Sequence, residues 1–309
     1  MTRILITGGA GMVGRALVAA LRPKDVIATD LSRAGLPADV TFRRMDVTGS
    51  DPDTVIGAER PDVVVHLASI VTPPPGMTRA QAFAVDVTGT RNVVAACVAH
   101  GVKRLVVTSS GAAYGYHPDN PVPLTEDAPC RGNPEFAYAD HKRQVEDILA
   151  EARRDHPELA QVVLRVGTVL GAGTDNQITA LFRRKRLLAI RNSDSPFVFI
   201  WTDDLARIVE RAATAGPAGI YNVAGDGWLS VDDLAQALGK PVLRLPAWVL
   251  KAALAVARPL GLSQYGPEQV RFLQYRPVLD NTRLKNVFGY TPQLTSAQVF
   301  DLWKNEAGL

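Results

Sequence analysis

A tyrosine and a lysine in the segment FAYADHKRQVEDILA have the spacing needed to move a proton. Tyr138 and Lys142 are four residues apart in a helical pattern, so their side chains share one face of the predicted helix. A phenol has an unperturbed pKa of about 10, and a neighbouring cation lowers that pKa by stabilising the phenolate. Tyr138 would then exchange a proton with a substrate oxygen. Ser110, which follows a predicted strand at 104–108, would hold the same oxygen.

A glycine-rich turn, TGGAGMVGRAL, lies between a predicted strand at 3–7 and a predicted helix at 12–21. Its glycines Gly8, Gly11 and Gly14 are spaced three apart. Glycine permits a tight turn, lets the backbone approach a pyrophosphate, and lets the helix pack closely on the strand. The free N–H groups at the helix N-terminus favour phosphate. The turn therefore predicts a dinucleotide site.

The cofactor predicted for this turn is NAD. Asp30 ends the next predicted strand, 22 residues after Gly8. A carboxylate there accepts hydrogen bonds from the adenosine ribose hydroxyls and repels a 2′-phosphate. Arg33 lies close by, so NADP stays open as an alternative. A phosphate-loop NTPase is excluded, because Arg15 and Ala16 stand where a phosphate-binding Lys and a magnesium-binding Ser or Thr are required.

Strands and helices alternate over the first two thirds of the chain. Short, continuous apolar runs predict parallel strands that are buried on both faces. These runs lie at 3–7, 25–30, 62–68, 104–108 and 161–166. The clearest helix is predicted over 79–99, with Thr78 and Gln81 as its capping box and Gly101 just past its end. The repetition predicts an α/β fold with a Rossmann-type, doubly wound parallel sheet.

The alternation breaks after residue 170, which predicts a second, smaller and mostly helical domain. We assign residues 1–170 and 199–225 to an NAD(P)-binding Rossmann domain, with a late strand at 219–225. Residues 171–198 and 226–309 are assigned to a substrate-binding domain.

The composition excludes several protein classes. Of 309 residues, 47% are hydrophobic and 21% are charged, which excludes a disordered or collagen-like chain. The two cysteines, Cys97 and Cys130, exclude a disulfide framework and suit a cytoplasmic location. A net charge of +3 gives no argument for nucleic acid as a partner. The spacing of the histidines and cysteines predicts no metal site.

No membrane contact is predicted either. The N-terminal residues show no signal-peptide pattern. Lys251 and Arg258 interrupt the most apolar window, residues 245–262, and lie seven residues apart on one helical face. This window predicts an amphipathic helix rather than a membrane span.

The ordered motifs resemble those of an extended short-chain dehydrogenase/reductase of the NAD-dependent epimerase/dehydratase type. The matching motifs are TGGAGMVG, HLAS, DVTGTRN, TSSGAAYG, YADHK, LRVGTVLG, FIWTDDLA, GIYNVAG and LDNTRLKNVFGYTP. The resemblance implies Ser110, Tyr138 and Lys142 as catalytic residues, adenine contacts from Asp46 and Val47, and a homodimer. The cofactor-binding residues it implies, together with the glycine turn, are Gly8, Gly11, Met12, Val13, Gly14, Asp30, Leu31, Asp46, Val47, Leu67, Ala68, Ser69, Tyr138 and Lys142.

Several positions depart from the pattern of the family it resembles. Asp86 stands where the family usually has Asn, His141 where Ser or Thr is common, and Trp201 where His is usual. Gly111 and Ala112 replace the Asp-Glu pair with which sugar-nucleotide dehydratases of this family eliminate water. Dehydration is therefore not expected.

The reaction expected is the interconversion of a secondary alcohol and a ketone on a small molecule, by hydride transfer with Tyr138 as the acid or base. A nucleotide-sugar epimerase with retained NAD and a non-catalytic NAD(P)-binding regulator are the alternatives. The apolar helix 247–257 favours an apolar substrate, unless it is simply core. The basic run 183–186 would bind a nucleotide diphosphate, unless it is a solvated helix face.

Overall fold

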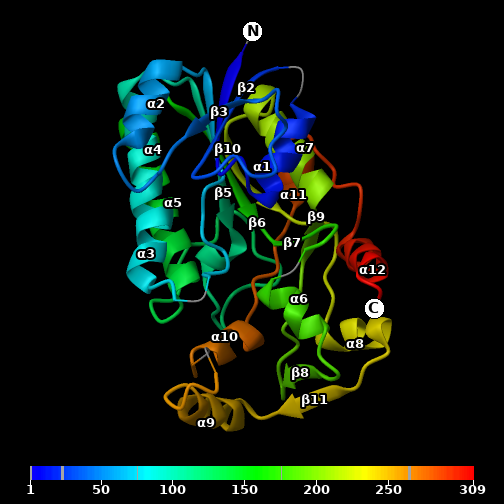
Figure 1. Cartoon of the computed structure of the whole chain (residues 1–309). Coiled ribbons are helices and arrows are strands. Elements are labelled where there is room, and N and C mark those ends of the chain that lie inside the picture. Colours follow the sequence, from blue (N-terminus) through cyan, green and yellow to red (C-terminus); the bar gives the residue numbers. More distant parts are fainter. Residues whose placement is uncertain (1, 22–23, 75, 175, 264–265) are drawn as a thin grey trace.

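A seven-stranded sheet, parallel throughout, organises the chain (Figure 1). The computed structural model describes residues 2–21, 24–74, 76–174, 176–263 and 266–309. The strand order is β10-β6-β5-β4-β1-β2-β3. The strands are β1 (Arg3–Thr7), β2 (Asp25–Asp30), β3 (Thr41–Arg44), β4 (Val63–His66), β5 (Arg104–Ser110), β6 (Ala160–Val166) and β10 (Gly219–Val223). The order reverses between β1 and β4, so the predicted doubly wound topology is confirmed, and the switch point of such a sheet is where ligands bind.

Helices cover both faces of the sheet and enclose one apolar core on each. The helices α2 (Asp51–Glu59), α4 (Gly89–Ala99) and α5 (Ala137–Asp155) lie on one face, and α1 (Met12–Ala20) and α7 (Thr202–Thr214) on the other (Figure 1). Ile56, Val94 and Leu149 pack on the first face. Leu17 and Ile208 pack on the second. The continuous apolar strand runs are buried because both faces are covered, as the sequence predicts.

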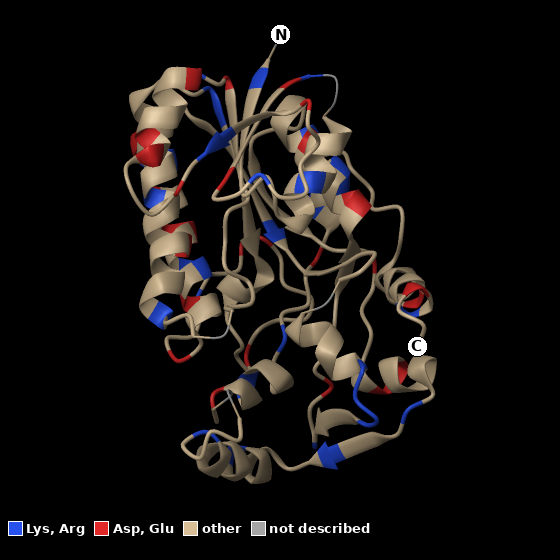
Figure 2. Cartoon of the chain, viewed as in Figure 1, with Lys and Arg blue, Asp and Glu red and all other residues tan. Residues whose placement is uncertain are grey.

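The edge strand β3 is not predicted by the sequence, because it is short and mostly exposed. Its residues, TFRR, carry no apolar run, and two arginines lie on it (Figure 2). Charged side chains of this kind protect an edge strand from pairing with another chain.

The helix predicted over 79–99 is one helical run with a π turn inside it. The run consists of α3 (Arg79–Phe83), a π turn at Ala84–Thr88, and α4. Thr78 and Gln81 form the predicted capping box, and Gly101 follows the end with a φ of 67°. Among the described helices, this run is long and apolar enough to cross a membrane, but half of its apolar window is buried in the fold, as in the core helix of a globular domain.

A second region holds its own aromatic core. Phe182, Phe300 and Trp303 pack there with Phe199 and Trp201. The surrounding elements are α6 (Gln177–Phe182), α8 (Val231–Leu238), α12 (Ser296–Glu306), the strand pair β8 (Leu187–Ile190) and β11 (Val242–Leu245), and the pair β7 (Thr168–Leu170) and β9 (Phe199–Trp201). The remaining helices are α9 (Ala247–Ala257), α10 (Gln269–Gln274) and α11 (Thr282–Asn286). The division of the chain into domains at residues 170, 198 and 225 is a proposal.

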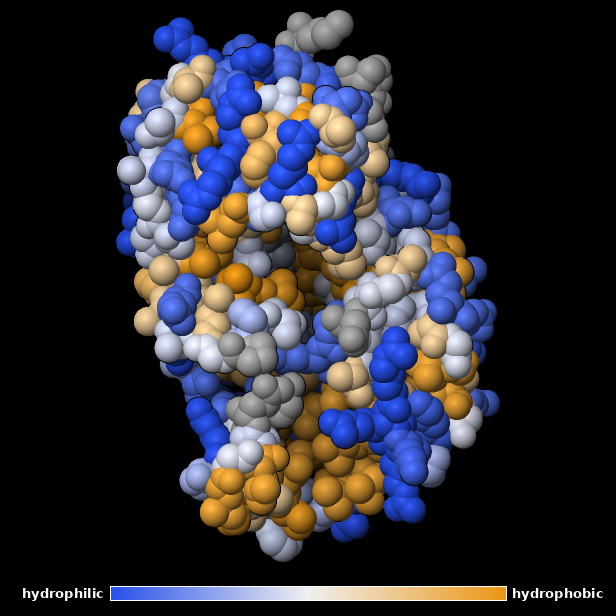
Figure 3. Space-filling view, in the orientation of Figure 1, coloured by the Kyte–Doolittle hydropathy of each residue, from blue (hydrophilic) through white to orange (hydrophobic). Residues whose placement is uncertain are grey.

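Two interpretations of this region need correction. The helix α9 is not core: none of its residues is buried, Trp248 is 72% exposed, and hydrophobic atoms gather over it in Figure 3. The basic run 183–186 is not a helix face, because α6 ends at Phe182 and the four side chains lie exposed in the turn that follows.

A buried ion pair joins α5 to β6 near the carboxyl-terminal end of that strand. Arg165 donates two hydrogen bonds of 3.0 Å to the Glu146 carboxylate, and both side chains are 6% exposed. The remaining amine of Arg165 donates to the Tyr114 hydroxyl and to the Glu126 carbonyl, each at 2.9 Å. Removal of either Arg165 or Glu146 would therefore leave the other charge buried without its hydrogen-bonded partner.

We expect Arg165→Met to lower the free energy of unfolding by about 3–5 kcal/mol, because the Glu146 charge would stay buried without a partner. Equilibrium denaturation in urea at pH 7 measures the change. The matched control is Arg154→Met, which removes an exposed arginine that pairs with Asp155 and should have no measurable effect. Equal stability of the two variants would contradict the expectation.

Candidate active site

The glycine turn has the tight geometry predicted for a phosphate-binding turn. Gly8 adopts a positive φ of 68°, which favours glycine. A Cβ on Gly14 would lie 2.3 Å from the Gly8 carbonyl oxygen, so no side chain fits between turn and helix. Gly11 caps α1 without any side-chain hydrogen bond, which leaves the first N–H groups of this nine-residue helix open to an anion. The turn therefore fits a dinucleotide pyrophosphate.

Asp30 is tied to the same turn. One of its carboxylate oxygens accepts a hydrogen bond from the Ala10 N–H at 3.1 Å, and the other accepts from the Leu31 N–H at 2.7 Å. The carboxylate thus lies at the end of β2, beside the turn, as the sequence predicts. Leu31 is 58% exposed next to it, where an adenosine could cover it.

A cavity of about 730 Å³ opens from the turn toward the second region, and Figure 3 shows the hollow between the two halves of the molecule. Of the predicted cofactor-binding residues, those lining the cavity are Met12, Val13, Leu67, Ser69, Tyr138 and Lys142. Those outside its lining are Gly8, Gly11, Gly14, Asp30, Leu31, Asp46, Val47 and Ala68. The predicted adenine contacts of Asp46 and Val47 stay predictions. Asp46 accepts hydrogen bonds from Thr48, and Val47 is buried against Gly89.

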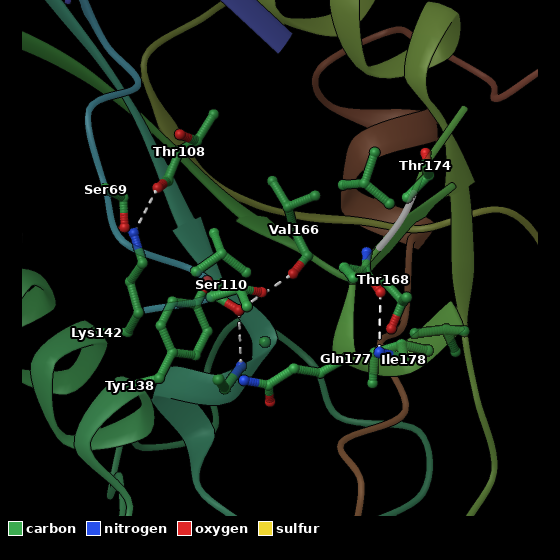
Figure 4. A pocket seen from close by; sticks show the side chains of 18 of the residues that line it. Ser69, Thr108, Ser110, Tyr138, Lys142, Val166, Thr168, Thr174, Gln177 and Ile178 are labelled. Atoms are coloured by element: carbon green, nitrogen blue, oxygen red, sulfur yellow. Dashed lines mark hydrogen bonds between the residues drawn. The ribbon is translucent and has the colours of Figure 1, made fainter. Parts of the chain in front are cut away.

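The predicted catalytic residues Ser110, Tyr138 and Lys142 converge at one end of β5 (Figure 4). Ser110 is the last residue of β5, and its hydroxyl accepts a 3.1 Å hydrogen bond from the Ala112 N–H. The Tyr138 side chain lies near enough to Ser110 for that hydroxyl to lower the Tyr138 pKa. The Lys142 ammonium donates to the Thr108 carbonyl at 3.1 Å and lies 5.8 Å from the centre of the Tyr138 ring. The three side chains can therefore act on one substrate oxygen.

Burial, rather than the neighbouring Lys142 ammonium, is the main influence on the pKa of Tyr138. Burial raises the pKa of Tyr138 to about 12, with the Ser110 hydroxyl opposing the shift and the charge of Asp86 adding to it. The expectation that Lys142 lowers the Tyr138 pKa below 10 is therefore wrong for this structure. Burial also lowers the pKa of Lys142, against the opposing charges of Asp86 and Glu146. Tyr138 is accordingly protonated at neutral pH.

Asp86 and His141, two departures from the family pattern, contact each other behind the site. His141 Nδ1 lies 3.0 Å from an Asp86 oxygen, and both side chains are 1% exposed. The other Asp86 oxygen accepts from the Ser69 hydroxyl and the Ile70 N–H, each at 2.8 Å. Burial would raise the Asp86 pKa, but the bond from His141 and the charge of Lys142 hold this pKa below its usual value. The pair links the wall of the cavity to α5.

The residues at the other end of the cavity are not predicted by the sequence. These side chains are Tyr116, Phe136, Gln177, Phe197, Gln269, Phe272 and Arg276. Figure 4 shows the Gln177 side chain reaching from α6 toward Ser110 and Tyr138. Neither α9 nor the basic run 183–186 contributes to the lining, so α10 takes the place expected of α9. Phe136, two residues before Tyr138, is the one member that the sequence pattern could have suggested.

His66 belongs to the packing of the sheet. Its two ring nitrogens lie 2.7 Å from the Thr7 hydroxyl and 3.0 Å from the Thr90 hydroxyl. Burial, followed by the charge of Lys142, lowers the His66 pKa to about 3, so the ring is neutral. Within the described residues, no group of three or more His, Cys, Asp or Glu side chains could hold a metal ion.

Comparison with known proteins supports the resemblance seen in the motifs. The profile of the NAD dependent epimerase/dehydratase family matches residues 4–224. An uncharacterised protein of Mycobacterium tuberculosis is 27% identical over 316 residues, which cover 99% of this chain and 84% of that protein. The 3-diazoavenalumate denitrifying reductase of a Streptomyces species is 30% identical over 270 residues, which cover 82% and 86% of the two chains.

Solved structures share the fold over almost the whole chain. A UDP-glucose 4-epimerase of Thermotoga maritima, solved with UDP-glucose, has a TM-score of 0.77 at 20% identity and covers 99% of both chains. A short-chain dehydrogenase/reductase superfamily protein of Agrobacterium tumefaciens, solved with bound NAD, has a TM-score of 0.73 at 22% identity and covers 99% of this chain and 97% of that one. At this identity the likeness concerns the fold.

We expect His141→Ser to destabilise the chain more when residue 86 is Asp than when it is Asn. Removing His141 takes a hydrogen-bond donor from a buried carboxylate, whereas an amide carries no charge to leave uncompensated. A double-mutant cycle of Asp86→Asn and His141→Ser should give a coupling of about 1–2 kcal/mol. Urea unfolding at pH 7, where Asp86 is ionised, measures it. Strictly additive effects would show that the two departures are independent.

Proposed function

Because this chain belongs to the NAD dependent epimerase/dehydratase family, we propose that it binds NAD and interconverts a secondary alcohol and a ketone of a small molecule. The observation that carries the proposal is the convergence of Ser110, Tyr138 and Lys142 in the cavity that begins at the glycine turn. Solved proteins of the same fold contain NAD, which supports the choice of cofactor. Asp30, beside the turn, favours NAD over NADP because its charge would repel a 2′-phosphate.

Each residue of the group has a distinct part in the proposed reaction. A bound nicotinamide dinucleotide supplies the hydride acceptor or donor. In reduction, the ketone carbon gains a hydride and its oxygen gains the Tyr138 proton. Oxidation is the reverse. Ser110 donates a hydrogen bond to that oxygen, and Lys142 stabilises the phenolate that forms when Tyr138 gives up its proton. A substrate and a dinucleotide that fill the cavity would keep water from competing for the oxygen.

The alternatives differ in stoichiometry. A nucleotide-sugar epimerase with retained NAD would oxidise and reduce the same substrate with no net change of cofactor. Two proteins of similar fold are named UDP-glucose 4-epimerases. The Streptomyces relative is named a reductase, which supports net redox chemistry. A non-catalytic regulator would have no need of both Tyr138 and Lys142 in one cavity. A cytoplasmic location and a homodimer complete the proposal.

We expect Tyr138→Phe to lower the turnover of a substrate that the wild type consumes by at least about a hundredfold, because the substrate oxygen loses its proton donor. Nicotinamide absorbance during a panel of ketones, alcohols and sugar nucleotides measures turnover and, through its net change, separates a dehydrogenase from an epimerase. Alcohol oxidation should accelerate as pH rises toward the Tyr138 pKa of about 12, because only the deprotonated phenol accepts a proton. Full activity in the phenylalanine variant would exclude Tyr138 as the proton-transfer group.

Asp30→Ala should weaken NAD binding and leave NADP binding unchanged or stronger. The variant loses an acceptor for the ribose hydroxyls and also the charge that repels a 2′-phosphate. Titration calorimetry with each dinucleotide measures both affinities. Asp25→Ala, at the opposite end of the same strand, is the control and should change neither. Equal weakening toward both dinucleotides would remove the ribose role of Asp30.

A further inference from the structure

Arg276 is a cation at the substrate end of the cavity that has no anionic partner among the described residues. Its guanidinium lies between two aromatic rings, 3.8 Å from the centre of Phe197 and 4.8 Å from that of Phe272. One terminal amine donates to the carbonyl and hydroxyl oxygens of Ser195, at 2.9 and 2.6 Å. The Nε atom is buried and finds no hydrogen-bond partner in the part of the chain that the structure describes.

An uncompensated, desolvated charge is costly for a fold to keep. Burial lowers the pKa of Arg276 to about 9, which reflects this cost. Contact with two ring faces offsets part of it, but a ring face does not replace a hydrogen-bonded anion. One terminal amine is bonded to Ser195, and the other, which has no hydrogen bond within the described residues, is left to offer to a ligand carboxylate. Arg276 thus lacks an anionic hydrogen-bond acceptor, which a bound ligand could supply.

The wall between Arg276 and the reaction centre is aromatic. Tyr116 packs edge-on against Phe136 and Phe272, each at 5.3 Å between ring centres, and these two rings stack at 5.9 Å. Tyr138 packs against the same cluster, and the Arg276 guanidinium contacts its Phe272 ring, so the cluster reaches from the phenol to the cation. Such a wall favours a flat, apolar ligand over one covered with hydroxyl groups.

We propose that the substrate is an aryl ketone or alcohol with a carboxylate, which places its carboxylate on Arg276, its ring against Phe136 and Phe272, and its reacting oxygen at Tyr138. The contact of the reacting oxygen with Tyr138 rests on the proposed function. The contacts of the carboxylate and of the ring are inferred from the cavity itself.

The charges along the cavity distinguish this substrate from a sugar nucleotide. The described cationic side chains that line it are Arg15, Lys142 and Arg276. Arg15 lies at the glycine turn and donates to the Ala10 carbonyl, and Lys142 donates to Thr108. Arg276 is therefore the one described lysine or arginine at the substrate end. One cation matches one carboxylate, whereas a nucleotide diphosphate brings two negative charges.

The test measures binding without turnover. A ketone and NAD⁺ cannot react with each other, so titration calorimetry of the NAD⁺-saturated protein reports ligand binding alone. The ligands are 4-acetylbenzoate, (4-acetylphenyl)acetate and 3-(4-acetylphenyl)propanoate, together with their methyl esters and UDP-glucose. Each acid has its ring between the ketone and the carboxylate, and the series varies the distance from ring to carboxylate. We expect at least one acid to bind about tenfold or more tightly than its ester and than UDP-glucose. Acids that bind no better than their esters, or UDP-glucose that binds most tightly, would overturn the proposal.

Substitution of the arginine tests the same contact from the side of the protein. Arg276→Gln should reduce acid binding to the level of the ester and leave ester binding unchanged. Arg271→Gln, which removes an exposed arginine of α10 that pairs with Glu135, should alter neither. If Arg276→Gln fails to fold, as judged by circular dichroism, the acid–ester comparison on the wild type decides alone. An acid preference that survives in Arg276→Gln would refute the assignment.

Turnover separates this proposal from the proposed function. Acids that bind through Arg276 while neither they nor their alcohols change nicotinamide absorbance would contradict the oxidoreductase and leave the binding site standing. Turnover of uncharged ketones that is lost in Tyr138→Phe, together with equal binding of acids and esters, would support the oxidoreductase and refute the carboxylate site.

Discussion

The site depends on a buried ammonium that the rest of the fold must compensate. Lys142 is 4% exposed, and isolated burial of such a charge costs several kcal/mol. The structure surrounds it with the Thr108 carbonyl and with two carboxylates, Asp86 and Glu146, each of which has a positive or polar partner of its own. Arg165 pairs with Glu146, and His141 bonds Asp86. The buried charges thus alternate in sign from β6 to the π turn, and the loss of any one leaves its neighbours uncompensated.

This arrangement couples the proposed catalytic group to the packing of the fold. Helix α5 carries Tyr138, Lys142 and Glu146, so one helix face presents the proton donor, the cation and the cation's partner. The π turn of the helical run 79–99 brings Asp86 against that face. Parallel strands end at the same edge, which places Thr108 and Ser110 opposite. A small displacement of α5 would therefore change the distances between the buried charges and the position of Tyr138 at the same time.

The sequence predicts what local spacing determines. The glycine turn, the strand ends and the Tyr138–Lys142 spacing each depend on a few adjacent residues, and the structure has them as expected. The edge strand β3 is missed because it buries too little to show an apolar pattern. The substrate end is missed because its parts are distant in the chain: Arg276 meets Phe197 and Ser195 across some 80 residues. No spacing rule connects such residues before the chain is folded.

The pKa of Tyr138 is a second property that local spacing does not predict. Helical spacing brings an ammonium near the phenol, and from this alone a lowered pKa follows. Spacing does not reveal that the phenol is buried or that Asp86 faces it, and both raise the pKa. An asparagine at position 86, usual in the family, would remove the second of these influences. The carboxylate therefore keeps Tyr138 protonated over a wider pH range, and in the proposed reaction the protonated phenol is the form that gives a proton to the ketone oxygen. Asp86 thus adds to the effect of burial in favouring the protonated phenol, whereas in the proposed reaction Lys142 would favour the phenolate that remains.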